Sequence, residues 1–293
     1  MSRFRNNAPL GFFWFFMVCL TCSMNDVCMK MLGDRLNFVE ISFFRFFFSL
    51  VIISIPVLLS KKNLLKTNFH AMHIARGVIG SLAIAMCCLG VLHLPLAENT
   101  TIEFTEVLFT IPLAAIFLKE NVSKKTIFSG VIGFIGLIIM FKPSAANINI
   151  YAAIPAFAAF LFAVMNIMIK TMVLNEEHDL TMLFYFALYS TVVASLFLPF
   201  FWQAPTPKEI VYLILLGIGS NIVQYFAFLG YKYIDASKVA PIRYTELITT
   251  AALAYMLFGQ TLDQSDIIGG LFIIVGTLIT SYSASSKNED HHH

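Results

Sequence analysis

Residues 99–113 read NTTIEFTEVLFTIPL, and residues 239–253 read VAPIRYTELITTAAL. Aligned without a gap at a spacing of 140 positions, IEFTEV in the first stretch falls on IRYTEL in the second. Both stretches are apolar enough to lie in lipid, yet each carries two charged side chains at matching places. A match of this kind between distant parts of one chain indicates an internal repeat. The charged residues are Glu103, Glu106, Arg243 and Glu246.

The same spacing also matches other parts of the two halves of the chain. One offset that aligns several separate segments is the mark of a duplication. We therefore predict two repeats, at residues 1–145 and 146–286, and a polar tail at 287–293. The tail ends in three histidines typical of an affinity tag, so we leave it out of the fold. The further matched pairs are Gly130 with Gly270, Gly136 with Gly276, Asp26 with Asn166, and Lys30 with Lys170.

The composition is that of an integral membrane protein. Of the 293 residues, 58% are hydrophobic and 12% are charged, whereas soluble domains have about 45–50% and about 25%. The formal net charge of +2 gives no indication of nucleic-acid binding. A membrane-spanning helix needs about 20 mostly apolar residues. The hydrophobic runs predict ten such helices, near residues 10–30, 40–59, 72–92, 98–118, 124–141, 149–170, 181–201, 209–231, 239–258 and 266–283.

Five spans in each repeat is an odd number, so the second repeat must enter the membrane in the opposite orientation. The predicted fold is therefore all-α, with ten transmembrane helices arranged as two inverted five-helix repeats. This architecture is found in many secondary transporters. Lysines and arginines gather in the connections on one side, including Lys61, Lys62, Lys124 and Lys125. The positive-inside rule makes that side cytoplasmic, together with both termini.

Charged residues within the predicted spans point to a binding pocket. A charge near the bilayer centre costs at least about 2.5–3.5 kcal/mol on insertion scales, so it normally faces a partner or an aqueous cavity. We expect spans 4 and 9 to face each other and to line such a pocket, with Pro241 interrupting span 9. The excess of acids favours a cationic or zwitterionic solute. The candidate substrate-binding residues are Glu106, Glu246, Arg243, Arg45, Tyr244, Glu103, Asp26, Tyr185, Phe104 and Asn166.

A structural role for some of these charges is the alternative. Asp26 lies four residues before Lys30, the spacing of an ion pair along one helix face. Arg45 or Arg243 would equally pair with a glutamate of another helix. Long basic side chains near span ends are expected to extend to the membrane interface. These basic residues are Lys30, Lys170 and Arg76.

The sequence contains no motif for metal, cofactor or catalytic chemistry. Cys19 and Cys22 form a C-x-x-C in mid-helix, without a second ligand pair and without the context of a redox motif. H-E-x-x-H and Walker A motifs are both absent, so we expect neither a zinc enzyme nor an ATP-driven pump. We therefore expect a secondary carrier and not an enzyme. Proton coupling through Glu106 and Glu246 and exchange of substrates both remain open.

The repeat pattern resembles that of a known transporter family. Residues 117–143, FLKENVSKKTIFSGVIGFIGLIIMFKP, close the first repeat in a way that is similar to the EamA branch of the drug/metabolite transporter superfamily. That resemblance implies a multi-pass protein of the bacterial inner membrane that carries small metabolites such as amino acids, nucleotides and riboflavin. Its partners would be the substrate and the lipid bilayer, and a homodimer is one assembly open to it.

A narrower resemblance concerns the substrate. Residues 25–49, NDVCMKMLGDRLNFVEISFFRFFFS, and residues 240–248, APIRYTELI, are similar to the S-adenosylmethionine transporters of intracellular bacteria. The chain departs from that group at Asn166, where an acid is expected, and in the acidic stretch from Glu103 to Glu106. The resemblance implies uptake of S-adenosylmethionine, alone or in exchange for S-adenosylhomocysteine. The alternative is transport or export of amino acids, riboflavin or another amine-bearing or aromatic metabolite.

The candidate residues suit the chemistry of S-adenosylmethionine. This molecule carries a sulfonium, an ammonium, a carboxylate and an adenine. Glu106 and Glu246 would attract the two cations, and either Arg45 or Arg243 would bind the carboxylate. Aromatic faces stabilise cations and stack on flat rings. Tyr244 and Tyr185 would supply them.

Overall fold

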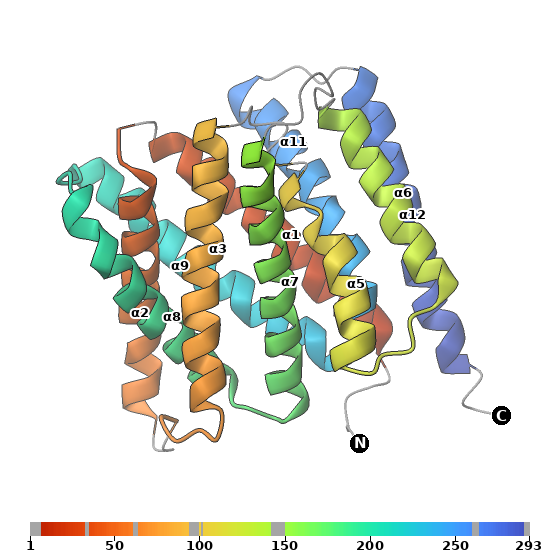
Figure 1. The fold of residues 1–293 in the computed structure, drawn as a ribbon, viewed down its shortest axis with the longest axis horizontal. Helices are drawn as coiled ribbons and strands as arrows, with labels where there is room; N and C mark the ends of the chain where they lie inside the picture. Colours follow the sequence, from red (N-terminus) through yellow and green to blue (C-terminus); the bar gives the residue numbers. More distant parts are fainter. Residues whose placement is uncertain are drawn as a thin grey trace.

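The computed structural model describes residues 7–32, 35–60, 64–93, 100, 102–141, 150–259 and 264–289. The described residues form a bundle of helices with no strand among them, as Figure 1 shows. The long helices are α1 (Ala8–Leu32), α2 (Phe38–Leu59), α3 (His70–His93), α5 (Glu106–Phe117), α6 (Lys124–Phe141), α7 (Ala153–Leu174), α8 (Asp179–Phe197), α9 (Pro207–Tyr233), α11 (Thr245–Phe258) and α12 (Gln264–Glu289). The short elements are η1 (Ile150–Ala152), η2 (Leu198–Phe200), α10 (Ala236–Val239) and η3 (Ala240–Tyr244).

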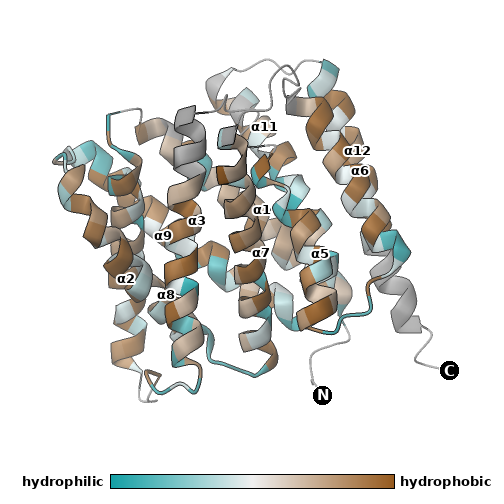
Figure 2. Ribbon diagram, in the orientation of Figure 1, coloured by the Kyte–Doolittle hydropathy of each residue, from teal (hydrophilic) through white to brown (hydrophobic). Residues whose placement is uncertain are grey.

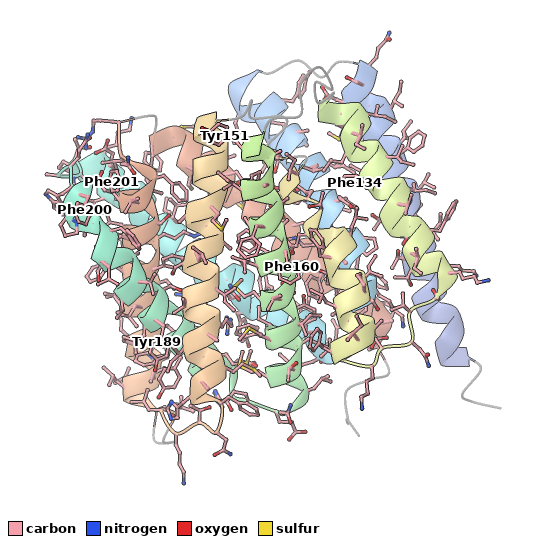
Figure 3. All side chains as sticks on the ribbon, in the orientation of Figure 1. Phe134, Tyr151, Phe160, Tyr189, Phe200 and Phe201 are labelled. Carbon is pink, nitrogen blue, oxygen red and sulfur yellow. The ribbon has the colours of Figure 1, made fainter. Side chains whose placement is uncertain are left out.

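The surface of the bundle is apolar, as expected of helices that face lipid. Within the described ranges, five segments are long and apolar enough to cross a membrane: Ala8–Met29, Phe38–Leu59, Ala153–Leu174, Asp179–Phe200 and Pro207–Tyr233. Apolar residues cover the helices along most of their length, while hydrophilic residues gather near their ends (Figure 2). Large apolar side chains project from the bundle (Figure 3), and Phe160 and Phe200 among them are 36% and 78% exposed. The all-helical class predicted from the sequence is confirmed.

Helices lie at all ten predicted positions, but two of them are broken. In the described part of the span predicted near 98–118, the helix is interrupted, because α5 begins only at Glu106, after a turn at Phe104 and Thr105. The predicted interruption at Pro241 is confirmed, since η3 separates α10 from α11. The three histidines at the C-terminus and the side chain of Lys30 lie outside the described residues.

The two breaks share one hydrogen bond, from a threonine hydroxyl to the carbonyl three residues before it. The Thr105 hydroxyl donates a hydrogen bond to the carbonyl of Ile102, with a distance of 2.5 Å. The Thr245 hydroxyl donates to the carbonyl of Ile242, with a distance of 2.7 Å. In both cases the following glutamate lies in the first turn of a helix, α5 or α11.

The packing of the helices pairs each half of the chain with the other. α1 begins, and α12 finishes, at the same end of the bundle (Figure 1). The α6–α12 pair stands at one side, and α2 with α8 at the other. The most extensive contacts are α1 with α9, α3 with α7, α2 with α9, α3 with α8, α1 with α11, α5 with α7, α2 with α8 and α6 with α12.

Glycines bring α6 and α12 into backbone contact. A Cβ atom placed on Gly136 would lie 2.6 Å from the carbonyl oxygen of Gly269. A Cβ atom placed on Gly269 would lie 2.5 Å from the carbonyl oxygen of Gly136. Small residues allow this approach between helices in membranes.

Two capping boxes fix the start of α2 and of α9 and join them to each other. Glu209 accepts a hydrogen bond from the Thr206 backbone N–H, with a distance of 2.6 Å. It also forms a bidentate ion pair with Arg35. Glu40 caps α2 through the Asn37 N–H and accepts a second hydrogen bond from the backbone N–H of Gln203. The bond to Glu209 raises the pKa of the Arg35 guanidinium. The α1–α2 and α8–α9 connections are therefore fastened together.

The predicted extension of Lys170 and Arg76 to the membrane interface was wrong. Lys170 is only 4% exposed, and its ammonium donates to the carbonyls of Tyr231 and Ile234, with distances of 2.6 and 2.7 Å. Arg76 is fully buried beneath the rings of Phe186 and Phe228. Cations fit at these places because helix-end carbonyls and aromatic faces stabilise them.

Glu120 supports the broken helix from the other side. Its carboxylate accepts hydrogen bonds from the backbone N–H groups of Ala236 and Ser237 at 2.8 and 2.9 Å. It also accepts one from the Ser237 hydroxyl at 2.6 Å. An anion is favourable at a helix N-terminus, so this contact holds the start of α10 against the end of α5.

Candidate substrate site

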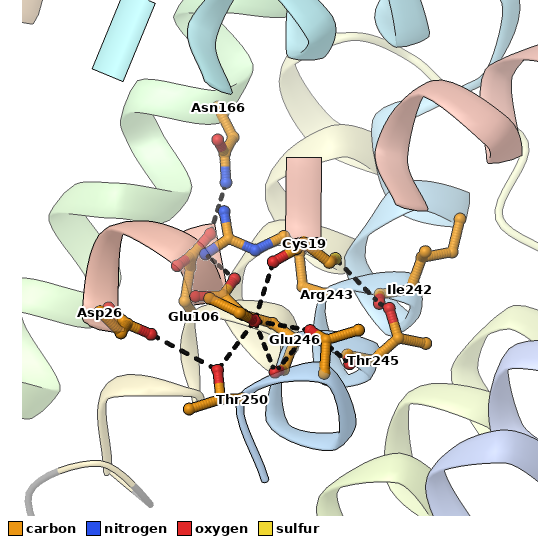
Figure 4. A network of polar contacts seen from close by, with 11 residues as sticks. Cys19, Asp26, Glu106, Asn166, Ile242, Arg243, Thr245, Glu246 and Thr250 are labelled. Carbon is orange, nitrogen blue, oxygen red and sulfur yellow. Dashed lines mark hydrogen bonds and ion pairs between the residues drawn. The ribbon is translucent and has the colours of Figure 1, made fainter. Parts of the chain in front are cut away.

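The first half of the site is formed by α5 and α7. Glu106 is the first residue of α5, where the helix dipole favours a negative charge. Its carboxylate accepts a hydrogen bond from the Asn166 amide of α7, with a distance of 2.6 Å (Figure 4). Asn166 therefore holds one oxygen of this acid in place while adding no charge of its own.

The second half is formed by η3 and α11. Arg243 and Glu246 form an ion pair of 3.3 Å, and their side chains are 26% and 14% exposed. Glu106 also attracts Arg243 electrostatically. The guanidinium therefore lies between two carboxylates that come from opposite halves of the chain (Figure 4).

Hydroxyl groups connect α1 to α11 beside these charges. The Ser23 hydroxyl is 2.6 Å from the Thr249 hydroxyl and 3.2 Å from the carbonyl oxygen of Glu246. The Thr250 hydroxyl donates to Ser23 at 2.9 Å and to the carboxylate of Asp26 at 3.4 Å. Asp26 is exposed on the structure. We use the name polar network for Asp26, Glu106, Asn166, Arg243 and Glu246 with these three hydroxyl residues.

Arg45 belongs to the same region but comes from α2. Its Nε donates to the Ser220 hydroxyl of α9, with a distance of 2.5 Å. Asp26 and Glu246 attract it electrostatically. Arg45 therefore lies at the edge of the polar network, bonded to a neutral side chain and not to an acid.

The predicted aromatic residues divide between two places. Phe104 and Tyr244 stack beside the polar network, with ring centroids 6.1 Å apart and an angle of 28° between the rings. Tyr244 is fully buried, and its hydroxyl has no hydrogen-bond partner among the described residues. Glu103, one turn before Glu106, is half-buried and has polar interactions of its own.

Tyr185 is not brought into the polar network. Its hydroxyl donates to the carbonyl of Leu65 in the α2–α3 connection, with a distance of 2.7 Å, and its ring packs on His73. The opposite directions of α2 and α8 explain this outcome. Tyr185 matches Arg45 in the repeat, but the two side chains lie at comparable distances from the starts of helices that begin at opposite ends of the bundle.

The charges of the site leave a negative balance. Asp26, Glu106 and Glu246 contribute three negative charges when ionised, and Arg45 and Arg243 contribute two positive charges. Such a group suits a ligand that carries at least one cation together with an anion. In the described part of the chain no group of three His, Cys, Asp or Glu side chains is arranged to hold a metal ion.

Sequence reasoning missed Ser23, Thr249, Thr250 and Ser220. Hydroxyl residues in apolar helices often bond only to their own helix, as Thr110 does to the carbonyl of Glu106. A serine or threonine in an apolar helix therefore does not by itself predict a binding site. The signal available was position, because Ser23 lies three residues before Asp26 and therefore on the same helix face.

Comparison with known proteins gives a family and several relatives. The model of the EamA-like transporter family matches residues 9–142 and 150–282. The S-adenosylmethionine uptake transporter of Rickettsia prowazekii (strain Madrid E) is 35% identical, over 95% of this chain and 96% of that protein. The protein of the same name from Rickettsia bellii (strain RML369-C) is also 35% identical, over 94% of each chain.

More distant matches include another transporter and a solved structure. A riboflavin transporter of Rhizobium johnstonii is 24% identical, over 87% of this chain and 85% of that protein. A solved protein crystal structure, 15% identical, covers 96% of this chain and 99% of its own, with a TM-score of 0.80. That similarity shows a shared fold.

Proposed function

Because the chain belongs to the EamA-like transporter family, we propose that it takes up S-adenosylmethionine across the bacterial inner membrane by alternating access. The observation that carries the proposal is the near-full-length similarity, at 35% identity, to S-adenosylmethionine uptake transporters. The polar network offers acids for the sulfonium and the ammonium and arginines for the carboxylate. The stacked Phe104 and Tyr244 lie beside it as aromatic neighbours.

The proposed architecture is ten spans in two inverted repeats, residues 1–145 and 146–286, with both termini in the cytoplasm. The family model matches in two segments, one in each half. The helix contacts give further support. If α1, α2, α3, α5 and α6 correspond to α7, α8, α9, α11 and α12, the α1–α9 contact corresponds to α7–α3, and α1–α11 corresponds to α7–α5. The contacts α2–α8 and α6–α12 each join a helix to its own counterpart, so the correspondence leaves them unchanged.

In the proposed mechanism the two repeats rock around the polar network and open it to one side at a time. Glu106 and Glu246 lie at the starts of α5 and α11, directly after the two breaks. One of these broken helices belongs to each proposed repeat. Binding or release of a ligand at the polar network therefore acts on both repeats. Binding energy that favours one orientation shifts the equilibrium between them.

The test is uptake of labelled S-adenosylmethionine into proteoliposomes that contain the purified protein. We expect saturable uptake that empty liposomes lack. Preloading with S-adenosylhomocysteine separates obligate exchange, in which uptake requires the internal ligand, from uniport or proton coupling, in which uptake also occurs without it. No uptake by protein that is folded and correctly inserted would refute S-adenosylmethionine as the substrate.

Glu246→Gln provides a test of the site within the same assay. The substitution keeps the shape of the side chain and removes its charge. Loss of a charge-assisted contact is worth about 1.5–3 kcal/mol, which corresponds to a loss of affinity of about 10- to 100-fold. Unchanged affinity would make Glu246 a structural partner of Arg243.

A different metabolite is the second candidate. Relatives at 24% identity include a riboflavin transporter and a pseudopaline exporter of Pseudomonas aeruginosa. Competition by amino acids and riboflavin in the uptake assay separates this candidate from the first.

A further inference from the structure

The two arginines near the polar network differ in how their charges are used. Arg243 is ion-paired with Glu246 at 3.3 Å and is attracted by Glu106 as well. Arg45 makes a single hydrogen bond, from Nε to Ser220. Its Nη1 and Nη2 atoms have no hydrogen-bond partner among the described residues. A guanidinium in this state presents the fork that binds a carboxylate with two parallel bonds.

Ser220 fixes the direction of that fork. The Ser220 hydroxyl donates its own hydrogen to the carbonyl of Leu216, with a distance of 2.7 Å. Its oxygen therefore faces Arg45 as an acceptor, and the bond of 2.5 Å to Nε leaves the end-on pair of N–H groups, one on each terminal nitrogen, without a bond to Ser220. Ser220 is only 8% exposed, so solvent does not compete strongly for this contact.

Asp26 is the matching free acid. It receives one long hydrogen bond, of 3.4 Å, from Thr250, and its side chain is exposed. Arg45 and Asp26 attract each other electrostatically. They nevertheless form no ion pair within 4.0 Å, although both residues are fully described.

The fold holds Arg45 and Asp26 near enough to attract each other but too far apart to form an ion pair. Arg45 is anchored to α9 at Ser220, and Asn25, beside Asp26, packs against α9 at Gly219. A Cβ atom on Gly219 would lie 2.0 Å from the Asn25 side-chain oxygen, so α1 approaches α9 closely at this level. A cation and an anion held apart in this way match a zwitterion, whose two charges are also separate.

From this arrangement we infer that Arg45 and Asp26 bind the amino-acid head group of the substrate. Arg45 binds the α-carboxylate, Asp26 binds the α-ammonium, and Ser220 is the positioning residue for Arg45. The inference rests on the proposed function, because S-adenosylmethionine carries such a head group. In this assignment Arg243 has a structural role in the site, and Glu246 stabilises the sulfonium.

The experiment measures equilibrium binding to the purified protein in nanodiscs with three ligands. They are S-adenosylmethionine, its decarboxylated analogue and its deaminated analogue, and methionine is measured beside them as a ligand that carries the head group without the adenosyl group. Arg45→Gln is expected to weaken S-adenosylmethionine about 10- to 100-fold and the decarboxylated analogue less than about threefold. Asp26→Asn, which copies Asn166 of the other repeat, is expected to weaken both of these ligands and to spare the deaminated one.

Two serine variants provide a matched pair. Ser220→Ala is expected to reduce the preference for S-adenosylmethionine over the decarboxylated analogue, because it releases the Arg45 fork. Ser49→Ala removes a hydroxyl of the same α2–α9 contact that bonds to Asn221 and not to Arg45. This variant is expected to leave the preference unchanged. Arg45→Lys keeps the charge without the fork and serves where Arg45→Gln fails to fold.

The outcomes separate this inference from the proposed function. Equal losses for all three ligands, or a carboxylate-selective loss in Arg243→Gln and not in Arg45→Gln, would overturn the head-group assignment while uptake stands. If the wild type ignores S-adenosylmethionine but binds methionine in an Arg45-dependent way, the proposed function fails and the head-group assignment holds. If none of these ligands binds to folded protein, both fail.

Discussion

Replacing Gly136 by alanine tests the backbone contact between α6 and α12. The new Cβ atom would lie 2.6 Å from the carbonyl oxygen of Gly269 and 2.9 Å from Cβ of Phe272. Ordinary contact begins at 3.4 Å, so the helices must separate by about 0.8 Å at this point. A backbone carbonyl and a Cβ atom cannot rotate out of the way, unlike the end of a flexible side chain.

The expected cost follows from two opposing terms. Overpacking of a tight contact costs about 1–3 kcal/mol, and alanine in place of glycine regains up to about 1 kcal/mol in a helix. We therefore expect Gly136→Ala to lower the free energy of unfolding by about 1–2 kcal/mol. Gly270→Ala, on the same helix pair, meets nothing within 4 Å and should be neutral or slightly stabilising.

The assay is reversible denaturant unfolding in mixed micelles, with both variants measured beside the wild type. Ligand affinity should change in neither variant, because neither glycine belongs to the polar network. If Gly136→Ala unfolded at the same midpoint as Gly270→Ala, the close approach of α6 and α12 would be wrong.

Four further substitutions test features outside the network. Lys170→Met should lower the thermal unfolding midpoint, because two carbonyls at the end of α9 lose a buried cation, a cost of about 2–4 kcal/mol; an unchanged midpoint would show that the contact contributes little. Glu120→Ala removes three hydrogen bonds and Ser237→Ala removes one, so the first should destabilise clearly more in the same thermal scan, and equal effects would contradict this account of α10. Tyr185→Phe should cost about 1 kcal/mol and leave S-adenosylmethionine affinity intact; reduced affinity in binding assays would return Tyr185 to the site.

The sequence predicted the helices and much of the polar network because both follow from the cost of polarity in lipid. Glu106, Arg243 and Glu246 had to find partners, and the repeat placed them on corresponding helices. The break at Pro241 was readable because proline lacks the N–H that a helix needs. The matching turn at Phe104 and Thr105 contains no such residue and was not foreseen.

Other features depend on contacts that are distant in the chain. Arg76 and Lys170 lie near helix ends, where long basic side chains are expected to extend to the membrane interface. Their burial depends on Phe186, Phe228 and the end of α9, which come from later segments. Tyr185 matches Arg45 at the spacing of 140 positions, but α2 and α8 begin at opposite ends of the bundle, so the two side chains lie apart. Periodicity and composition hold no information on such distances.

Two of the matched positions in the two proposed repeats carry different charges. Glu103 corresponds to Arg243, and Asp26 corresponds to Asn166. Two identical halves would give the inward-facing and outward-facing states equal free energies, and an empty carrier would occupy them equally. In the proposed mechanism these mismatches make the two free energies unequal, so we expect the empty carrier to prefer one orientation. The ratio of the two populations changes tenfold for each 1.4 kcal/mol or so of difference. The affinity measured from the disfavoured side is weakened by that ratio, while the substrate gradients alone set the direction of net flux.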